Sequence, residues 1–145
     1  MRRDVLVVGG GPTGCLAAAA MAAELEVTVV EEHPRIGEPV QCAGLVTPRV
    51  VEMASAPDAV LNRIDGAYVH FPGGRTLELQ GNEVKAVVVD RGALDRRCAS
   101  LAERAGAEVW TGVRCGAVER TGDGIRACFD GEDMECRALL AADGY

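Results

Sequence analysis

Near the start of the chain, two short apolar runs are separated by a stretch that is long enough to form a helix. Residues 4–8 are almost all apolar and lead into three glycines, and residues 27–30 form a second apolar run that ends at Glu31. Runs of this kind are typical of parallel strands buried on both faces. Between them, Pro12 can begin a helix that the alanine-rich residues 15–24 continue. The pattern predicts a strand–helix–strand unit.

A second strong helical pattern begins only at residue 91. Asp90 can cap its amino terminus and Gly106 can end it. The apolar residues on one face of this helix are Leu94, Cys98, Leu101, Ala102 and Ala105. We predict a helix over 91–105, followed by strands over 108–111, 117–120, 125–129 and 135–141.

The stretch between Glu32 and Asp90 lacks the long helix that a simple strand–helix–strand repeat would place there. Thr47 is a candidate cap for a short helix through Ala54. Residues 67–71 and 75–79 predict a hairpin around Pro-Gly-Gly, and residues 85–89 predict another strand. We interpret this stretch as an inserted, largely β region.

Composition narrows the classes of protein that fit. The chain has 145 residues, 48% hydrophobic but only 3% aromatic, so its core must be built from Val, Leu and Ala. The net charge is −7 and no cluster of Lys or Arg stands out, so we expect no nucleic-acid partner. No apolar run approaches the roughly 20 residues of a membrane-spanning helix.

The six cysteines indicate a reducing environment. They form no C-x-x-C pair, and no secretory signal precedes the first strand, so we predict a cytoplasmic protein. For each thiol the default expectation is a small, buried apolar residue. His33 and His70 have no partner at ligand spacing, and we expect no metal site.

Three glycines carry the strongest chemical signal. Gly9, Gly11 and Gly14 have the G-x-G-x-x-G spacing, in which the first allows a sharp turn, the second lets a pyrophosphate approach the backbone, and the third brings helix and strand together. Glu31, at the end of the second strand, can accept two hydrogen bonds from the hydroxyls of an adenosine ribose and disfavours a 2′-phosphate. The plain alternative is an ordinary turn with Glu31 as a solvated strand end.

FAD and NAD share this type of cradle, and the inserted region favours FAD. A domain that binds only a nicotinamide nucleotide usually continues directly to another helix and strand. The predicted fold class is therefore α/β: a Rossmann-like FAD-binding domain over residues 1–145, with a parallel sheet plus an inserted antiparallel β region. An NAD-binding Rossmann domain is a weaker alternative.

Several motifs resemble the geranylgeranyl reductase family of FAD-dependent oxidoreductases. Residues 36–45, Ile-Gly-Glu-Pro-Val-Gln-Cys-Ala-Gly-Leu, follow the glycine motif and Glu31 and contain a discriminating P-x-x-C-x-G segment. Residues 89–95, 105–108 and 142–144 are similar to later motifs of that family and keep their order. The resemblance covers nearly the whole chain as the amino-terminal part of such a protein.

The resemblance implies roles for individual residues. Gly14 would lie on the pyrophosphate, Glu31 on the ribose, Arg91 against the cofactor, and Cys115 beside the adenine. Near the flavin, Cys42 would be either a proton donor or a small residue packed under the ring. The predicted cofactor-binding residues are Gly9, Gly11, Pro12, Gly14, Glu31, Cys42, Ala43, Gly44, Arg91, Cys115 and Asp143.

For function, the resemblance implies reduction of isoprenoid double bonds, with a prenyl lipid or another apolar small molecule as substrate and peripheral membrane contact through that substrate. We find no second Gly-Asp segment and no tunnel for a prenyl chain, so we expect a partial chain. A non-catalytic or degenerate nucleotide-binding fragment is the main alternative. Uncovered sheet edges and apolar faces predict self-association as a homo-oligomer.

Overall fold

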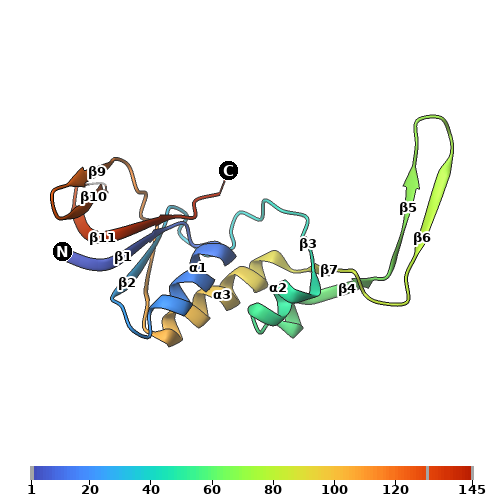
Figure 1. Cartoon of the computed structure of the whole chain (residues 1–145), viewed down its shortest axis with the longest axis horizontal. Helices are drawn as coiled ribbons and strands as arrows, with labels where there is room; N and C mark the ends of the chain where they lie inside the picture. Colours follow the sequence, from blue (N-terminus) through green and yellow to red (C-terminus); the bar gives the residue numbers. More distant parts are fainter. Residues whose placement is uncertain (1, 130, 145) are drawn as a thin grey trace.

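The computed structural model describes residues 2–129 and 131–144. The molecule is elongated, with a large sheet at one end, two long helices in the middle and a projecting hairpin at the other end (Figure 1). The helices are α1 (Pro12–Met21), α2 (Pro48–Met53), α3 (Arg91–Ala105) and the short 3-10 turn η1 (Pro57–Ala59). The strands are β1 (Arg2–Val8), β2 (Val27–Glu31), β3 (Leu45–Val46), β4 (Val60–Ile64), β5 (Gly66–His70), β6 (Thr76–Gln80), β7 (Ala86–Val89), β8 (Glu108–Thr111), β9 (Val118–Thr121), β10 (Gly124–Cys128) and β11 (Asp133–Ala141).

The large sheet confirms the predicted α/β, Rossmann-like fold. Its strand order is β8-β2-β1-β11-β10-β9. The neighbours β8, β2, β1 and β11 are parallel, whereas β10 and β9 add an antiparallel edge. β1 lies between β2 and β11, and its side chains are covered on both faces of the sheet. Val7 is fully buried in the cluster that includes residues of α1 and α3, and Leu6 is fully buried in a second cluster with Met134 and Cys136. This explains the continuous apolar run in the sequence.

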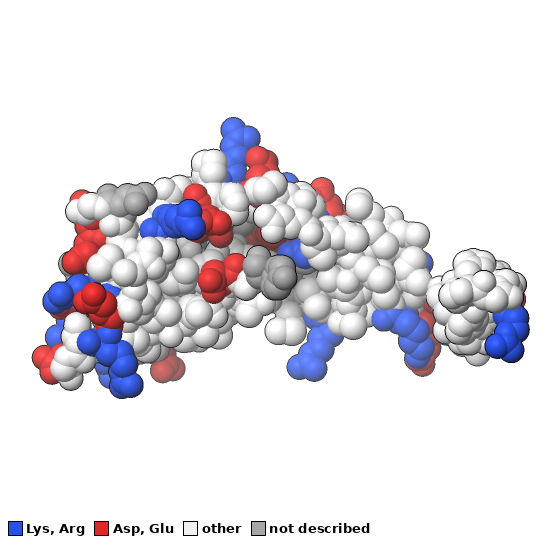
Figure 2. Space-filling view, turned by 90° about the horizontal axis from the view of Figure 1, so that it is seen from above, with Lys and Arg blue, Asp and Glu red and all other residues white. Residues whose placement is uncertain are grey.

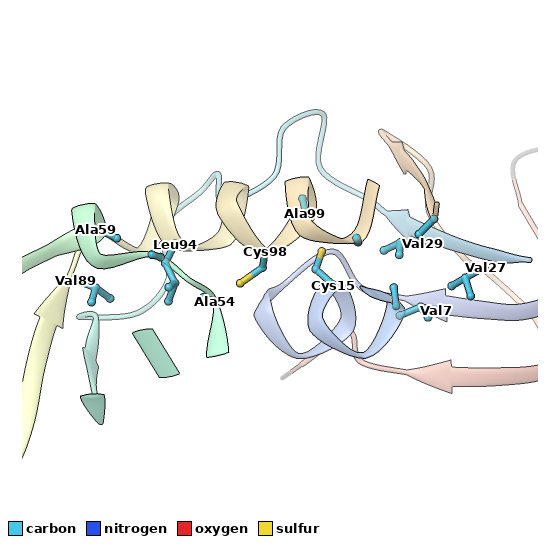
Figure 3. Packing of buried hydrophobic residues seen from close by; sticks show 14 of the residues in the cluster. Val7, Cys15, Val27, Val29, Ala54, Ala59, Val89, Leu94, Cys98 and Ala99 are labelled. Carbon is cyan, nitrogen blue, oxygen red and sulfur yellow. The ribbon is translucent and has the colours of Figure 1, made fainter. Parts of the chain in front are cut away.

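Helices α1 and α3 pack on one face of this sheet and on each other. Figure 3 shows Cys15 of α1 and Cys98 of α3 within one cluster that also contains Val7 and Val29 of the strands. The predicted bounds of α3 are confirmed. The Asp90 side chain accepts a hydrogen bond from the Ala93 amide at 2.9 Å, and Gly106 ends the helix with a positive φ of 108°.

The buried face of α3 differs slightly from the predicted one. Leu94, Cys98 and Ala102 are buried as expected, but Ala99 is also buried, whereas Leu101 and Ala105 are only half-buried. The helix therefore turns its small residues, which allow close approach, toward α1.

The inserted region forms two small sheets of its own. One has the strand order β3-β7-β4, and the other is the β5–β6 hairpin. The predicted hairpin, the β7 strand and the short helix α2 are present. Thr47 stands at the amino-terminal cap position of α2, as predicted, although its side chain makes no cap hydrogen bond.

The hairpin has one apolar and one polar face. Register places Ala67 opposite Leu79 and Val69 opposite Leu77, and these pairs share a face. On the other face, Tyr68 donates to Glu78 at 3.1 Å. All six residues are exposed, and the hairpin forms a separate lobe that is largely uncharged on the face seen in Figure 2.

The cysteines do not all follow the default expectation. Cys15, Cys98 and Cys136 are buried, but Cys115 and Cys128 are half-buried and Cys42 is exposed. Burial raises the pKa of Cys15 to about 12, so that thiol stays protonated. In the described part of the chain, no helix is long and apolar enough to cross a membrane.

Candidate functional site

A cleft of about 570 Å³ opens at the carboxyl ends of β1, β2 and β11. Ligand pockets typically measure about 300–1,000 Å³. The cleft is lined by the glycine turn before α1, the residues after β2, part of the 37–42 loop, the start of α3, the 113–115 segment and the residues after β11. In open parallel sheets, ligands bind beyond the carboxyl ends of the strands, and this cleft lies there.

The glycine turn has the geometry that each glycine was predicted to supply. Gly9 has a φ of 107°, and a Cβ on it would overlap the Ala142 carbonyl oxygen. A Cβ on Gly14 would overlap the Gly9 carbonyl oxygen, so only glycine lets the helix approach so closely. Around Gly11, by contrast, there is nothing within 4 Å of an added Cβ. The backbone at Gly11 is therefore open to a ligand in the cleft.

A buried thiol forms a hydrogen bond to the backbone of the glycine turn. Cys15 of α1 donates from Sγ to the Gly10 carbonyl oxygen at 3.2 Å. The turn also continues into the amino terminus of α1, where Pro12 occupies the first turn. Backbone amides at a helix amino terminus attract phosphate through their partial positive charge.

Glu31 faces the cleft and is already engaged by neighbouring donors. Its Oε2 accepts from the Gly10 amide at 2.8 Å, and its Oε1 accepts from the His33 amide at 3.0 Å and contacts His33 Nδ1 at 2.5 Å. Burial alone would raise the pKa of Glu31, but these hydrogen bonds outweigh burial and hold the pKa below its ordinary value. Glu31 is therefore an ionised acceptor that lies beside the glycine turn in the cleft wall.

Arg91, Asp95 and Cys42 meet at another part of the cleft wall. Arg91 donates from Nε to Asp95 Oδ1 at 3.2 Å, one helical turn apart. Arg91 is thus a half-buried, paired cation rather than a free surface charge. Burial raises the pKa of Asp95, against the opposing effect of Arg91.

The exposed Cys42 thiol has a lowered pKa. The Gly44 amide is the main cause and the Arg91 guanidinium adds to it, while partial desolvation opposes both. A thiol under these influences gives up its proton more readily than an ordinary cysteine. The geometry is compatible with proton transfer at Cys42 Sγ.

Not all of the predicted site residues line the cleft. The structure brings together eight of them there: Gly9, Gly11, Pro12, Glu31, Cys42, Arg91, Cys115 and Asp143. Gly14 lies beneath the turn and acts through packing. Ala43 and Gly44 are not in the lining, and Gly44 instead packs against the backbone of Val89.

Sequence reasoning missed several polar residues of the cleft, among them His33, Asp95 and Arg114. Arg114 reaches the cleft because the segment after β8 is hydrogen-bonded to the end of β2, with the Val113 amide donating to the Glu31 carbonyl oxygen at 2.9 Å. Its side chain lies 3.6 Å from Glu32. The i, i+4 spacing of Arg91 and Asp95 was the one sequence signal that could have revealed part of this set.

Comparisons with known proteins agree with this geometry. Residues 7–49 match the model of the NAD(P)-binding Rossmann-like domain family. The chain is 36% identical to a digeranylgeranylglycerophospholipid reductase of Methanothrix thermoacetophila, with 99% of this chain and 40% of the relative covered. The same enzyme from Thermoplasma volcanium is also 36% identical, with 98% and 39% covered.

This chain corresponds to the amino-terminal part of the geranylgeranyl reductase family. A crystal structure of a geranylgeranyl bacteriochlorophyll reductase-like protein from Thermoplasma acidophilum has a TM-score of 0.84 and 30% identity to it, and covers 99% of this chain and 40% of that protein. The halogenase PltM, solved with phloroglucinol and FAD, shares the fold at a TM-score of 0.75 and 18% identity. The chain spans about two fifths of the length of the geranylgeranyl reductases it matches.

Proposed function

We propose that this chain binds FAD and forms the cofactor-binding part of a reductase that acts on isoprenoid double bonds of a prenyl lipid or a related apolar molecule. The observation that carries the proposal is the open backbone at Gly11, at the start of α1, with the Glu31 carboxylate bound to the neighbouring Gly10 amide in the same cleft. A diphosphate suits the amides of the turn, and a ribose suits the acceptor. The relationship to digeranylgeranylglycerophospholipid reductases supports the choice of substrate class.

Each cleft residue has a role in this proposal. Gly9, Gly11, Pro12 and Gly14 shape the phosphate cradle, and Arg91 adds a cation that Asp95 holds in place. Cys115 and Asp143 would border the cofactor on the side of the 113–115 segment and of β11. Bound FAD, once reduced by an external electron donor, would supply a hydride to one carbon of a double bond.

Cys42 is the proposed source of the proton for the other carbon. Its thiol is exposed in the cleft wall, and the Gly44 amide and Arg91 stabilise the thiolate that remains after proton transfer. Water would return the proton to the thiolate. If Cys42 is instead only a small residue packed beside the flavin, Cys42→Ser should leave the reaction rate nearly unchanged.

Flavin uptake tests the cofactor proposal directly. The purified chain is incubated with FAD, freed of excess flavin and examined by absorbance, beside the variant Gly11→Val. An added Cβ at Gly11 meets no protein atom within 4 Å, and the backbone there has a φ of −72° that any residue can adopt. We therefore expect the variant to fold and to lose at least tenfold in FAD affinity.

Gly122→Val is the matched control, because Gly122 also has nothing within 4 Å of an added Cβ but lies outside this cleft. Equal FAD uptake by wild type and Gly11→Val contradicts the proposal. Failure of the wild type to take up FAD favours a non-catalytic fragment.

A nicotinamide nucleotide is the second candidate ligand, because the matched family model describes an NAD(P)-binding domain. Fluorescence enhancement of NADH without flavin uptake would support it.

The substrate proposal is tested with dithionite-reduced flavin and a geranylgeranyl lipid in detergent micelles. Mass spectrometry should detect the gain of two hydrogens per reduced double bond. Cys42→Ser should slow this gain severalfold, whereas Cys128→Ser, outside the cleft, should not. Contact with a membrane would then occur through the lipid substrate.

A further inference from the structure

The Glu31 carboxylate has more bonding partners than its predicted role assumed. It receives the Gly10 amide on Oε2 and both the amide and the ring Nδ1 of His33 on Oε1. A carboxylate has about four acceptor positions, two on each oxygen. Among residues 2–129 and 131–144, these donors fill both positions of Oε1 and one position of Oε2.

The ring of His33 must act as a donor in this arrangement. Glu31 is ionised, because its hydrogen bonds hold its pKa below the ordinary value, and an ionised carboxylate only accepts. The proton on the imidazole therefore sits on Nδ1. The other ring nitrogen, Nε2, lies 4.0 Å from Glu32 Oε1.

The pair lies where a ligand would meet it. Both residues line the cleft, and the side chain of His33 is 36% exposed while that of Glu31 is 15% exposed. The one remaining acceptor position belongs to Oε2, the oxygen that also holds the Gly10 amide of the glycine turn. A ribose attached to a diphosphate on that turn would reach Oε2 with one hydroxyl.

We propose that His33 is a specificity-determining residue that occupies Oε1 of Glu31, so that the site recognises one hydroxyl of the adenosine ribose instead of two. This inference rests on the proposed nucleotide function and deepens it. The residue acts through Glu31 and is therefore a positioning residue. It replaces the two-hydroxyl contact that the glycine motif and Glu31 predicted from sequence.

Binding of ADP, 2′-deoxy-ADP and 3′-deoxy-ADP tests the proposal by competition with FAD. For the wild type, removing one hydroxyl should weaken binding about tenfold, and removing the other should change it less than about twofold. In His33→Leu, Oε1 regains a free position, so both deoxy analogues should bind about tenfold more weakly than ADP. His33→Asn keeps a side-chain donor close to the position of Nδ1 and should restore the wild-type pattern.

Equal losses for both deoxy analogues in the wild type would overturn the inference while leaving the FAD proposal intact. If the wild type bound neither FAD nor ADP, the proposed function would fail, and the ribose site with it.

A measurement without nucleotide checks the underlying contact. Carbon NMR of the Glu31 carboxyl should show a higher pKa in His33→Leu than in the wild type, and a wild-type value in His33→Asn. An unchanged pKa in His33→Leu would show that the ring does not hold Oε1 and would overturn the inference.

Discussion

The glycine turn and the β5–β6 hairpin use the same residue types in opposite surroundings. An added Cβ on Gly14 of the turn would overlap backbone, whereas one on Gly73 of the hairpin would meet nothing within 4 Å. Likewise, Val7 in β1 is fully buried, while Leu77 in β6 is 48% exposed. Both strands carry apolar residues, but only β1 has a neighbour on each side and a helix over it.

The difference shows that an apolar residue stabilises the fold only where other elements bury it. Burial of an apolar side chain contributes about 1.5–3 kcal/mol, and an exposed one contributes almost nothing. A two-stranded sheet alone is marginal in water. The part of the molecule that holds the cleft should therefore contribute most of the free energy of folding. The hairpin should contribute most to self-association.

The largest contrast should come from leucine truncation. Leu94 of α3 is 1% exposed, and Leu94→Ala should lower the free energy of unfolding by about 3 kcal/mol, because it removes buried contacts and leaves a cavity. Leu77→Ala in the hairpin should cost less than about 1 kcal/mol. Urea denaturation of both variants measures the difference, and similar losses would remove the contrast between the two regions.

The second largest difference in stability between the two regions should come from glycine substitution. Gly14→Ala should destabilise the protein by about 2 kcal/mol, since its methyl group would push α1 away from the turn. Gly73→Ala should change stability by about 0.5 kcal/mol or less. Thermal unfolding followed by circular dichroism compares them, and a tolerated Gly14→Ala would show that the turn is not tightly packed.

Acid should weaken the glycine turn at Glu31. The pKa of Glu31 is lower in the folded than in the unfolded state, so its stabilising effect is present above the unfolded pKa and is lost as pH falls through the folded one. Glu31→Gln should cost about 1 kcal/mol at pH 7 and progressively less in acid. Glu83→Gln, at an exposed site near the hairpin, is the control. Parallel stability curves for Glu31→Gln and the wild type would contradict this assignment.

The smallest effect on stability should accompany the largest effect on association. The double variant Leu77→Lys with Leu79→Lys should change the free energy of unfolding by less than about 0.5 kcal/mol, because both side chains are exposed. It should nevertheless lower the mass measured by light scattering, since it places charge on the apolar face of the hairpin. A wild type that stays monomeric at high concentration would contradict the predicted self-association.

Sequence reasoning succeeded where the signal was local. The bounds of α3 follow from Asp90, Gly106 and the helical period between them, and the β5–β6 hairpin follows from its turn. It missed β3 and β4, whose pairing with β7 joins residues far apart in the chain. In β4, Leu61, Asn62 and Arg63 are all exposed, and a register shift interrupts the pairing, so no alternation marks the strand.

The sequence by itself determined the strand–glycine turn–helix unit, the acidic end of β2 and the α/β class, because backbone conformation and burial periodicity are set by neighbouring residues. Only the tertiary structure decided that Arg114 shares the cleft with Glu31, that Ala43 does not line it, and that His33 occupies Glu31 Oε1. These outcomes depend on how β8 and β11 join the sheet beside β2 and β1, where hydrogen bonds connect segments distant in sequence.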